Sequence, residues 1–200
     1  ATISGTAVTL RGIFKDYSTG ATLVGTTSIT NNTITITDNF ISGTLECIRT
    51  LGTVASTSTL LDTANTILNT TMGGASSSTT IVGIVNSSAW GTLKMNGNII
   101  RGTSSTATTG GFTGVSNTGA VVTTIEMNRN QIGNASGGAI SFSAATNGAV
   151  SGIICSGGAS TCTTTIQGND FRGISYSVLA SSANTYITQT AAVASANING

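Results

Sequence analysis

A short pattern recurs along this chain and constrains its fold more than any other feature. It consists of an apolar residue, two residues, an asparagine, one residue, an apolar residue, one residue, and then glycine or asparagine. The full copies contain Asn39, Asn98, Asn130 and Asn169, and a weaker copy at Asn65 has Asp62 in place of the leading apolar residue. Successive asparagines are 26, 33, 32 and 39 residues apart, which indicates a repeat architecture.

Runs that alternate apolar with small or polar residues follow most copies, at residues 44–48, 111–115, 138–142 and 173–178. This alternation has the period of a half-buried strand. Each repeat is therefore predicted to be one coil of short strands, and stacking coils about 4.8 Å apart buries their inward side chains. The chain is expected to form one all-β domain over residues 1–200, a right-handed parallel β-helix of about six coils, clearest over 29–180.

The asparagines have a defined role in such a stack. Asparagine tolerates the left-handed backbone conformation of a corner, and its side-chain amide can bond to the asparagine of the next coil. A ladder is therefore predicted along the stack: Asn39, Asn65, Asn98, Asn130 and Asn169. The absence of proline agrees with this fold, since interior strands need every N–H group.

One stretch, residues 59–68, also allows a short helix. Its apolar residues follow helical spacing, with Thr59 and Asp62 placed as in a capping box. The corner at Asn65 favours a coil, so the helix is the alternative.

The Asn-x-Ile-x-Gly corners resemble right-handed parallel β-helix repeats of the pectate-lyase-like type. They look most like the Thr/Gly/Asn-rich versions found in secreted surface proteins of Bacteroidetes-type bacteria. The resemblance covers residues 29–180. It implies the fold, but that repeat carries lyases, adhesins, phage spikes and structural stalks, so it does not select a function.

Composition excludes several classes of function. Charged residues make up 6% of the chain, the net charge is +1, and histidine is absent. Nucleic-acid or anionic-membrane binding needs clustered basic charge, and most metal sites and general bases use histidine. No apolar run is long enough to cross a bilayer, and residues 1–4 lack the features of a signal peptide, as expected for a mature or excised segment. No cofactor or metal is expected.

The chain has three cysteines. Cys155 and Cys162 bracket a small, flexible loop and are candidates for a disulfide; two free thiols are the alternative. A disulfide would indicate an oxidising compartment outside the cytoplasm. Cys47 lies in an alternating run and is interpreted as a packed core residue.

The acidic residues do not form a recognisable catalytic pair. Asp38 and Asp170 flank asparagine corners several coils apart, whereas paired catalytic carboxylates lie within about 10 Å. The other acids are Asp16, Glu46, Asp62 and Glu126. They are interpreted as solvated residues, and no enzyme is predicted.

Ligand contacts have fewer candidates. Trp90 and Tyr176 could stack on a sugar ring, although a lone tryptophan in a glycine-rich loop more often covers the core. Arg101 and Arg172 occupy equivalent repeat positions and could form a sparse basic stripe. Threonine runs such as residues 33–37 suggest ice binding, but the unequal coil lengths argue against a regular threonine array.

These observations favour an extracellular structural protein. The chain is expected to be a rigid building block of a cell-surface fibre, sheath, stalk or adhesin that associates with itself, its irregular ends stacking on neighbours. The alternatives, in order, are an adhesin module that binds glycans or a surface through loops 104–111 and 144–152, an ice-binding protein, and a polysaccharide lyase.

Overall fold

The computed structural model describes residues 8–17, 23–38, 43–72, 78, 80–134, 136, 140–176 and 183–199. Its regular structure in these ranges is entirely β-strand, and the strands form four parallel sheets. Sheet 1 contains β1 (Val8–Tyr17), β5 (Gly43–Gly52), β9 (Thr80–Asn86), β13 (Phe112–Asn117), β17 (Val150–Cys155) and β21 (Asn184–Gln189). Sheet 2 contains β2 (Thr26–Thr30), β6 (Thr59–Thr63), β10 (Thr92–Lys94), β14 (Thr124–Glu126), β18 (Thr163–Gln167) and β22 (Ser195–Asn199).

The other two sheets have five strands each in the described residues. Sheet 3 contains β3 (Thr33–Ile34), β7 (Thr66–Leu68), β11 (Ile99–Arg101), β15 (Gln131–Ile132) and β19 (Asp170–Phe171). Sheet 4 contains β4 (Thr37–Asp38), β8 (Thr71–Met72), β12 (Ser104–Ser105), β16 (Ile140–Phe142) and β20 (Ile174–Tyr176).

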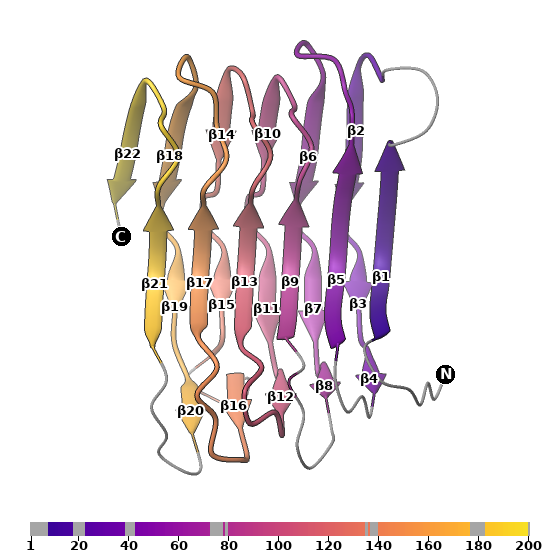
Figure 1. Ribbon diagram of the computed structural model, residues 1–200, viewed down its shortest axis with the longest axis vertical. Coiled ribbons are helices and arrows are strands. Elements are labelled where there is room, and N and C mark those ends of the chain that lie inside the picture. The colour runs from indigo at the N-terminus through magenta and orange to yellow at the C-terminus, as the bar shows by residue number, and fades with distance from the viewer. Residues whose placement is uncertain are drawn as a thin grey trace.

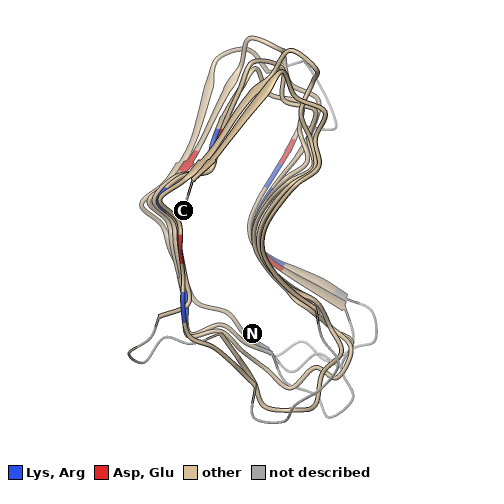
Figure 2. Ribbon diagram, turned by 90° about the vertical axis from the view of Figure 1, so that its left-hand side faces the viewer, with Lys and Arg blue, Asp and Glu red and all other residues tan. Residues whose placement is uncertain are grey.

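Every strand pairs with the fourth strand before or after it in the chain, which is the connectivity of a β-solenoid (Figure 1). The structure has about 5 turns, so the predicted parallel β-solenoid is confirmed. Seen along the stack, the coils lie almost on top of one another and outline an elongated, bent ring (Figure 2). Since no helix occurs in the described residues, none there is long and apolar enough to cross a membrane.

The helical alternative for residues 59–68 is wrong. This stretch forms β6 and β7, which belong to different sheets. Leu60 pairs with Leu93 and Ile67 with Ile100, so both side chains enter the apolar core of the stack. Burial between two neighbouring coils outweighs the helical spacing, as tertiary contacts commonly do.

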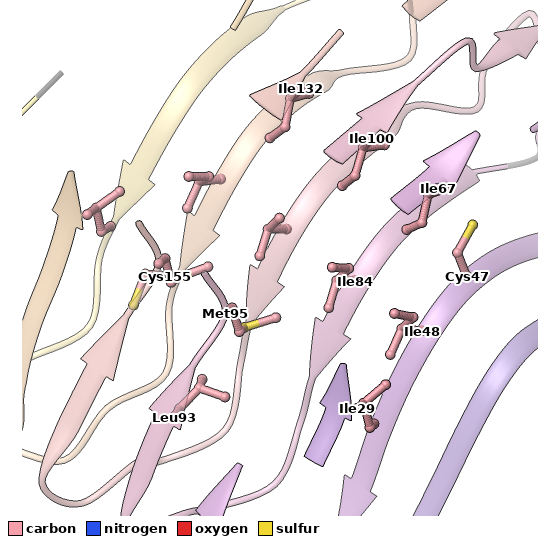
Figure 3. Packing of buried hydrophobic residues seen from close by; sticks show 14 of the residues in the cluster. Ile29, Cys47, Ile48, Ile67, Ile84, Leu93, Met95, Ile100, Ile132 and Cys155 are labelled. Atoms are coloured by element: carbon pink, nitrogen blue, oxygen red, sulfur yellow. The ribbon is translucent and has the colours of Figure 1, made fainter. Parts of the chain in front are cut away.

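The core consists of apolar columns that run along the stack. Ile67, Ile100 and Ile132 follow one another in sheet 3 and are all buried (Figure 3). Ile48 and Ile84 form a similar file on sheet 1. A solenoid coil is thus stabilised by side chains of the coils above and below it.

Glycines on sheet 1 make room for the large side chains of sheet 3. A Cβ atom on Gly83 would lie 2.6 Å from Ile100 Cδ1, and one on Gly114 would lie 2.5 Å from Ile132 Cδ1. The same holds for Gly152, whose Cβ would lie 2.3 Å from Phe171 Cε1. These glycines therefore allow the close approach of sheets 1 and 3.

Candidate functional site

A ladder of asparagine side chains runs through the corner between sheets 2 and 3. The side-chain amide nitrogen of each member donates to Oδ1 of the next, at 2.9, 3.3, 3.0 and 3.0 Å along the series Asn32, Asn65, Asn98, Asn130 and Asn169. The backbone N–H groups of the first four donate to the same oxygens at 2.8–3.0 Å. The four later amides also donate to a carbonyl of the preceding coil. Each rung thus joins neighbouring coils by several bonds.

Four of the five asparagines named from the sequence lie in this ladder, but its first member is Asn32. The fifth, Asn39, lies outside the described residues. Because Thr33 and Ile34 pair with Thr66 and Ile67, the residue opposite Asn65 is Asn32. The spacings are therefore 33, 33, 32 and 39 residues, and the first value of 26 is corrected.

A second buried ladder was not predicted from the sequence. Thr50 Oγ1 donates to Asn86 Oδ1 at 2.7 Å, and Asn86 Nδ2 donates to Asn117 Oδ1 at 2.7 Å. Asn117 Nδ2 continues to the carbonyl oxygen of Gly157 at 3.0 Å. All three side chains are buried at the end of sheet 1. The signal in the sequence is an asparagine that ends a strand-like run, at Asn86 after residues 80–85 and at Asn117 after residues 112–116.

Trp90 does not reach the surface. Its side chain is 0% exposed, its ring packs edge-on against Tyr17 with centroids 5.6 Å apart, and its Nε1 donates to Asn86 Oδ1 at 3.0 Å. A buried ring offers no face to a sugar, so the structure favours the interpretation that Trp90 covers the core over that of a ligand contact. The tryptophan covers the corner between sheets 1 and 2.

Tyr176 lies elsewhere, in sheet 4. Its ring stacks on Phe142 at a centroid distance of 5.2 Å, and its hydroxyl donates to Asn184 Oδ1 at 2.5 Å. The structure therefore does not bring Trp90 and Tyr176 into one site.

Cys155 and Cys162 are free thiols in this structure and both are buried, as is Cys47. The candidate disulfide between Cys155 and Cys162 is therefore not formed. Burial raises the pKa of the Cys47 thiol to about 12 and that of Cys155 to about 11, and it also raises the pKa of Cys162. A protonated, buried thiol is a poor nucleophile, which opposes disulfide formation.

Basic and acidic residues lie near one another along the coils (Figure 2), and the ion pairs described here join them. Glu46 accepts from Arg11 at 2.6 Å and from Arg49. Lys94 Nζ lies 3.0 Å from Glu126, and Arg172 binds the Asp170 carboxylate through two nitrogens. The three groups of paired charges lie on different coils and do not form one cluster. The described residues contain no group of three or more acidic or cysteine side chains arranged to hold a metal ion.

Asp62 points into the core, whereas Glu46, also buried, is paired with Arg11 and Arg49. Asp62 is 1% exposed, and burial raises the pKa of its carboxyl to about 8, although the hydrogen bond from Asn65 acts in the opposite direction. Its neighbour on β2 is Ile29. Since the carboxyl replaces the apolar residue that leads each repeat, the sequence pattern had already marked this position.

Two outward columns contain residues that were candidates for surface binding. Arg101 and Arg172 lie in one column of sheet 3, with Gly133 between them. On sheet 2, hydroxyl residues pair in register in every coil, namely Thr26, Thr59, Thr92, Thr124, Thr163 and Ser195. The unequal coil lengths do not disturb this column, because the extra residues lie between the strands.

No family model, curated protein or solved structure matches this chain. The parallel β-solenoid is established by its strand pairing, and the function rests on the arrangement of the residues described above.

Proposed function

We propose that this chain is a rigid structural module of an extracellular fibre, sheath, stalk or adhesin at a bacterial cell surface. The observation that carries the proposal is the amide ladder from Asn32 to Asn169, buried at its three central members, which links five successive coils. The amide groups of these asparagines are thereby directed along the stack, from one coil to the next.

The ladders make the stack cooperative. A buried hydrogen bond contributes about 1 kcal/mol net, but a buried amide that loses its partner costs about 1–3 kcal/mol. Opening one coil would break bonds of the coils on both sides, since Asn98 bonds to both Asn65 and Asn130. A rod that resists bending and local opening suits a spacer or fibre.

The outer surface supports an extracellular structural role. It presents a column of threonine and serine residues, and its acidic side chains with described ion pairs are each paired with arginine or lysine. A surface with little net charge favours association over repulsion between molecules. The resemblance to secreted β-helix repeats of Bacteroidetes-type bacteria supports placement at a bacterial surface.

The glycan-binding alternative is weaker than the structural role. Its main aromatic contact, Trp90, is buried and hydrogen-bonded to Asn86. Tyr176 is stacked on Phe142, and the structure does not bring it together with Trp90.

Immunogold electron microscopy of intact cells that produce this chain tests the proposal. Continuous labelling of fibres or of a surface layer is expected without permeabilisation. Labelling that requires permeabilised cells, or that is confined to the cell interior, would overturn the extracellular structural role. A strain that lacks the chain is the control for the antibody.

A further inference from the structure

One corner of the stack holds two thiols that the structural role does not use. Cys155 ends β17, Cys162 directly precedes β18, and the chain between them turns from sheet 1 to sheet 2. Both side chains are 0% exposed and belong to the apolar core, in which Figure 3 labels Cys155. Since Cys162 and Thr164 are buried while Thr163 is exposed, the Cys162 and Thr164 side chains lie on the same, inward side of the chain.

The coil that contains β17 and β18 departs from its neighbours at these positions. Cys155 follows Asn117 in the column of the second ladder, where a sulfur takes the place of an amide. Thr164 follows Leu93 and Ile125 in an inward column of sheet 2, where a hydroxyl takes the place of apolar side chains. Departures from the local pattern that gather at one corner are typical of a site whose chemistry, and not packing alone, sets the residues.

The Thr164 hydroxyl contacts both sulfurs. Its Oγ1 is buried and forms no hydrogen bond with a nitrogen or oxygen atom in the described part of the chain. The groups within hydrogen-bonding reach of its side chain are Cys155 and Cys162, so the two sulfurs meet at one hydroxyl. A buried hydroxyl without an acceptor is costly, and a thiolate accepts its proton more strongly than a thiol does.

Other donors also face the sulfurs. The Asn117 side chain interacts with Cys155, and the backbone of Ile125 interacts with Cys162. The thiols themselves have only long contacts, of 3.7 and 3.5 Å, to backbone carbonyl oxygens. The donors favour a thiolate at each position, whereas burial and the repulsion between two negative sulfurs oppose it. A cation between the sulfurs would remove that opposition.

We propose that Cys155 and Cys162 bind Cu(I) through two thiolates, with Thr164 donating a hydrogen bond to a sulfur ligand. Thiolate sulfur selects soft ions, and Cu(I) accepts two such ligands in a linear arrangement. A structural zinc site needs four ligands, but the chain has no histidine and its described residues hold no group of three cysteine or acidic side chains. Each thiol releases its proton to solvent as its bond to copper forms, and the surrounding donors stabilise the negative charge of the complex.

The pair lies directly beneath the surface. Cys162 is flanked by the exposed residues Thr161 and Thr163, and the exposed Ser156 follows Cys155. A local opening of this turn therefore suffices to admit an ion. The bound ion would join the end of β17 to the start of β18 and fix the turn between sheets 1 and 2.

The experiment titrates the reduced 200-residue chain with Cu(I), without oxygen and against a chelating competitor. One equivalent is expected to bind, with the ultraviolet absorption of Cu(I)–thiolate bonds and the matching mass in native mass spectrometry. Cys155→Ser and Cys162→Ser each leave a single thiolate and should weaken binding at least about a hundredfold. Thr164→Val removes the hydroxyl at nearly constant volume and should weaken binding about tenfold.

Cys47→Ser is the matched control. Cys47 is also a buried thiol, but it lies on β5, three strands away from β17 in sheet 1, so its loss should leave the affinity and the stoichiometry unchanged. Excess Zn(II) should not displace Cu(I) from the wild-type chain or from this variant.

Stability gives a second measurement that needs no cysteine variant to fold. One equivalent of Cu(I) should raise the urea midpoint of the wild-type chain, and less so that of Thr164→Val. Four results would overturn the proposal: no binding against the competitor, equal weakening in Cys47→Ser, full affinity in the urea-unfolded chain, or a disulfide between Cys155 and Cys162 in the chain as isolated. An unchanged urea midpoint on adding Cu(I) would overturn it as well.

Discussion

Asn65 donates its side-chain amide to the Asp62 carboxyl at 2.8 Å, and both side chains are buried beside the asparagine ladder. This hydrogen bond connects one rung of the ladder, which links neighbouring coils, to a side chain that titrates. The carboxyl is held in its neutral form because the surrounding core does not solvate a charge.

Stability should therefore fall as the pH rises. The pKa of Asp62 is about 8 in the folded chain against 3.8 for an unperturbed group, so folding favours the protonated form. Its contribution is fully present below about pH 4, declines as the pH rises, and is lost above about pH 8, with a total change of several kcal/mol. Urea unfolding between pH 4 and 9 measures this change.

Asp62→Asn should flatten that profile, because an amide keeps a partner for Asn65 and does not ionise. Asp170→Asn, which removes a carboxylate from a surface ion pair with Arg172, is the control and should keep the alkaline decline. An unchanged slope in Asp62→Asn would assign the pH dependence to another group.

A central rung of the ladder should matter more than its last member. Asn98→Ala removes bonds to Asn65, to Asn130 and to the carbonyl of Asp62, and leaves buried groups without partners. We expect a loss of about 2–4 kcal/mol in the free energy of unfolding, against about 1–2 kcal/mol for Asn169→Ala. Chemical denaturation measures both, and equal losses would contradict a ladder that couples coils on both sides.

The sequence predicted the ladder in part because a corner asparagine leaves a local pattern. Asn65 was found although Asp62 breaks that pattern, but Asn32 was missed because Ile36 follows where the pattern asks for glycine or asparagine. The Asn86–Asn117 bond was missed for another reason. These residues lie at a strand end, and only the register of sheet 1 shows that they meet.

The sequence favoured a core-covering role for Trp90 but did not decide it. A glycine-rich loop is compatible with an exposed or a buried ring, and the contacts that decide are Tyr17 and Asn86, from other strands. The unequal loop lengths argued against a regular threonine column, but the strand pairing keeps Thr92 and Thr124 in register.

The glycine column on sheet 1 should resist even a methyl group. A Cβ atom on Gly114 would lie 2.5 Å from Ile132 Cδ1 and 2.7 Å from the carbonyl oxygen of Gly152. Gly114→Ala should therefore cost about 1–3 kcal/mol in the free energy of unfolding. Ile132→Val removes the clashing methyl, so the double variant should recover part of that loss relative to additivity. Additive losses would mean that the two positions do not collide.

Trp90 is the one tryptophan of the chain, so its fluorescence reports directly on this corner. A ring with 0% exposure should emit at shorter wavelength than in the unfolded chain and should resist quenching by iodide. Adding oligosaccharides should leave the spectrum unchanged. Efficient quenching in the folded chain, or a shift on adding sugar, would restore Trp90 as a ligand contact.

The threonine column should not bind ice. It is a single file, because the outward column two residues along contains Leu61, Lys94 and Glu126 between Ser28 and Thr165. The ion pair between Lys94 and Glu126, 3.0 Å apart, holds charged and strongly hydrated groups where a second row of hydroxyls would be needed to match an ice surface. We therefore expect no thermal hysteresis from the wild-type chain in a nanolitre osmometer.

Replacing both residues, as in Lys94→Thr with Glu126→Thr, extends the second row of hydroxyls. Hysteresis that appears only in this double variant would identify the ion pair as the obstacle to ice binding. Hysteresis in the wild type would show that one file of hydroxyls is enough.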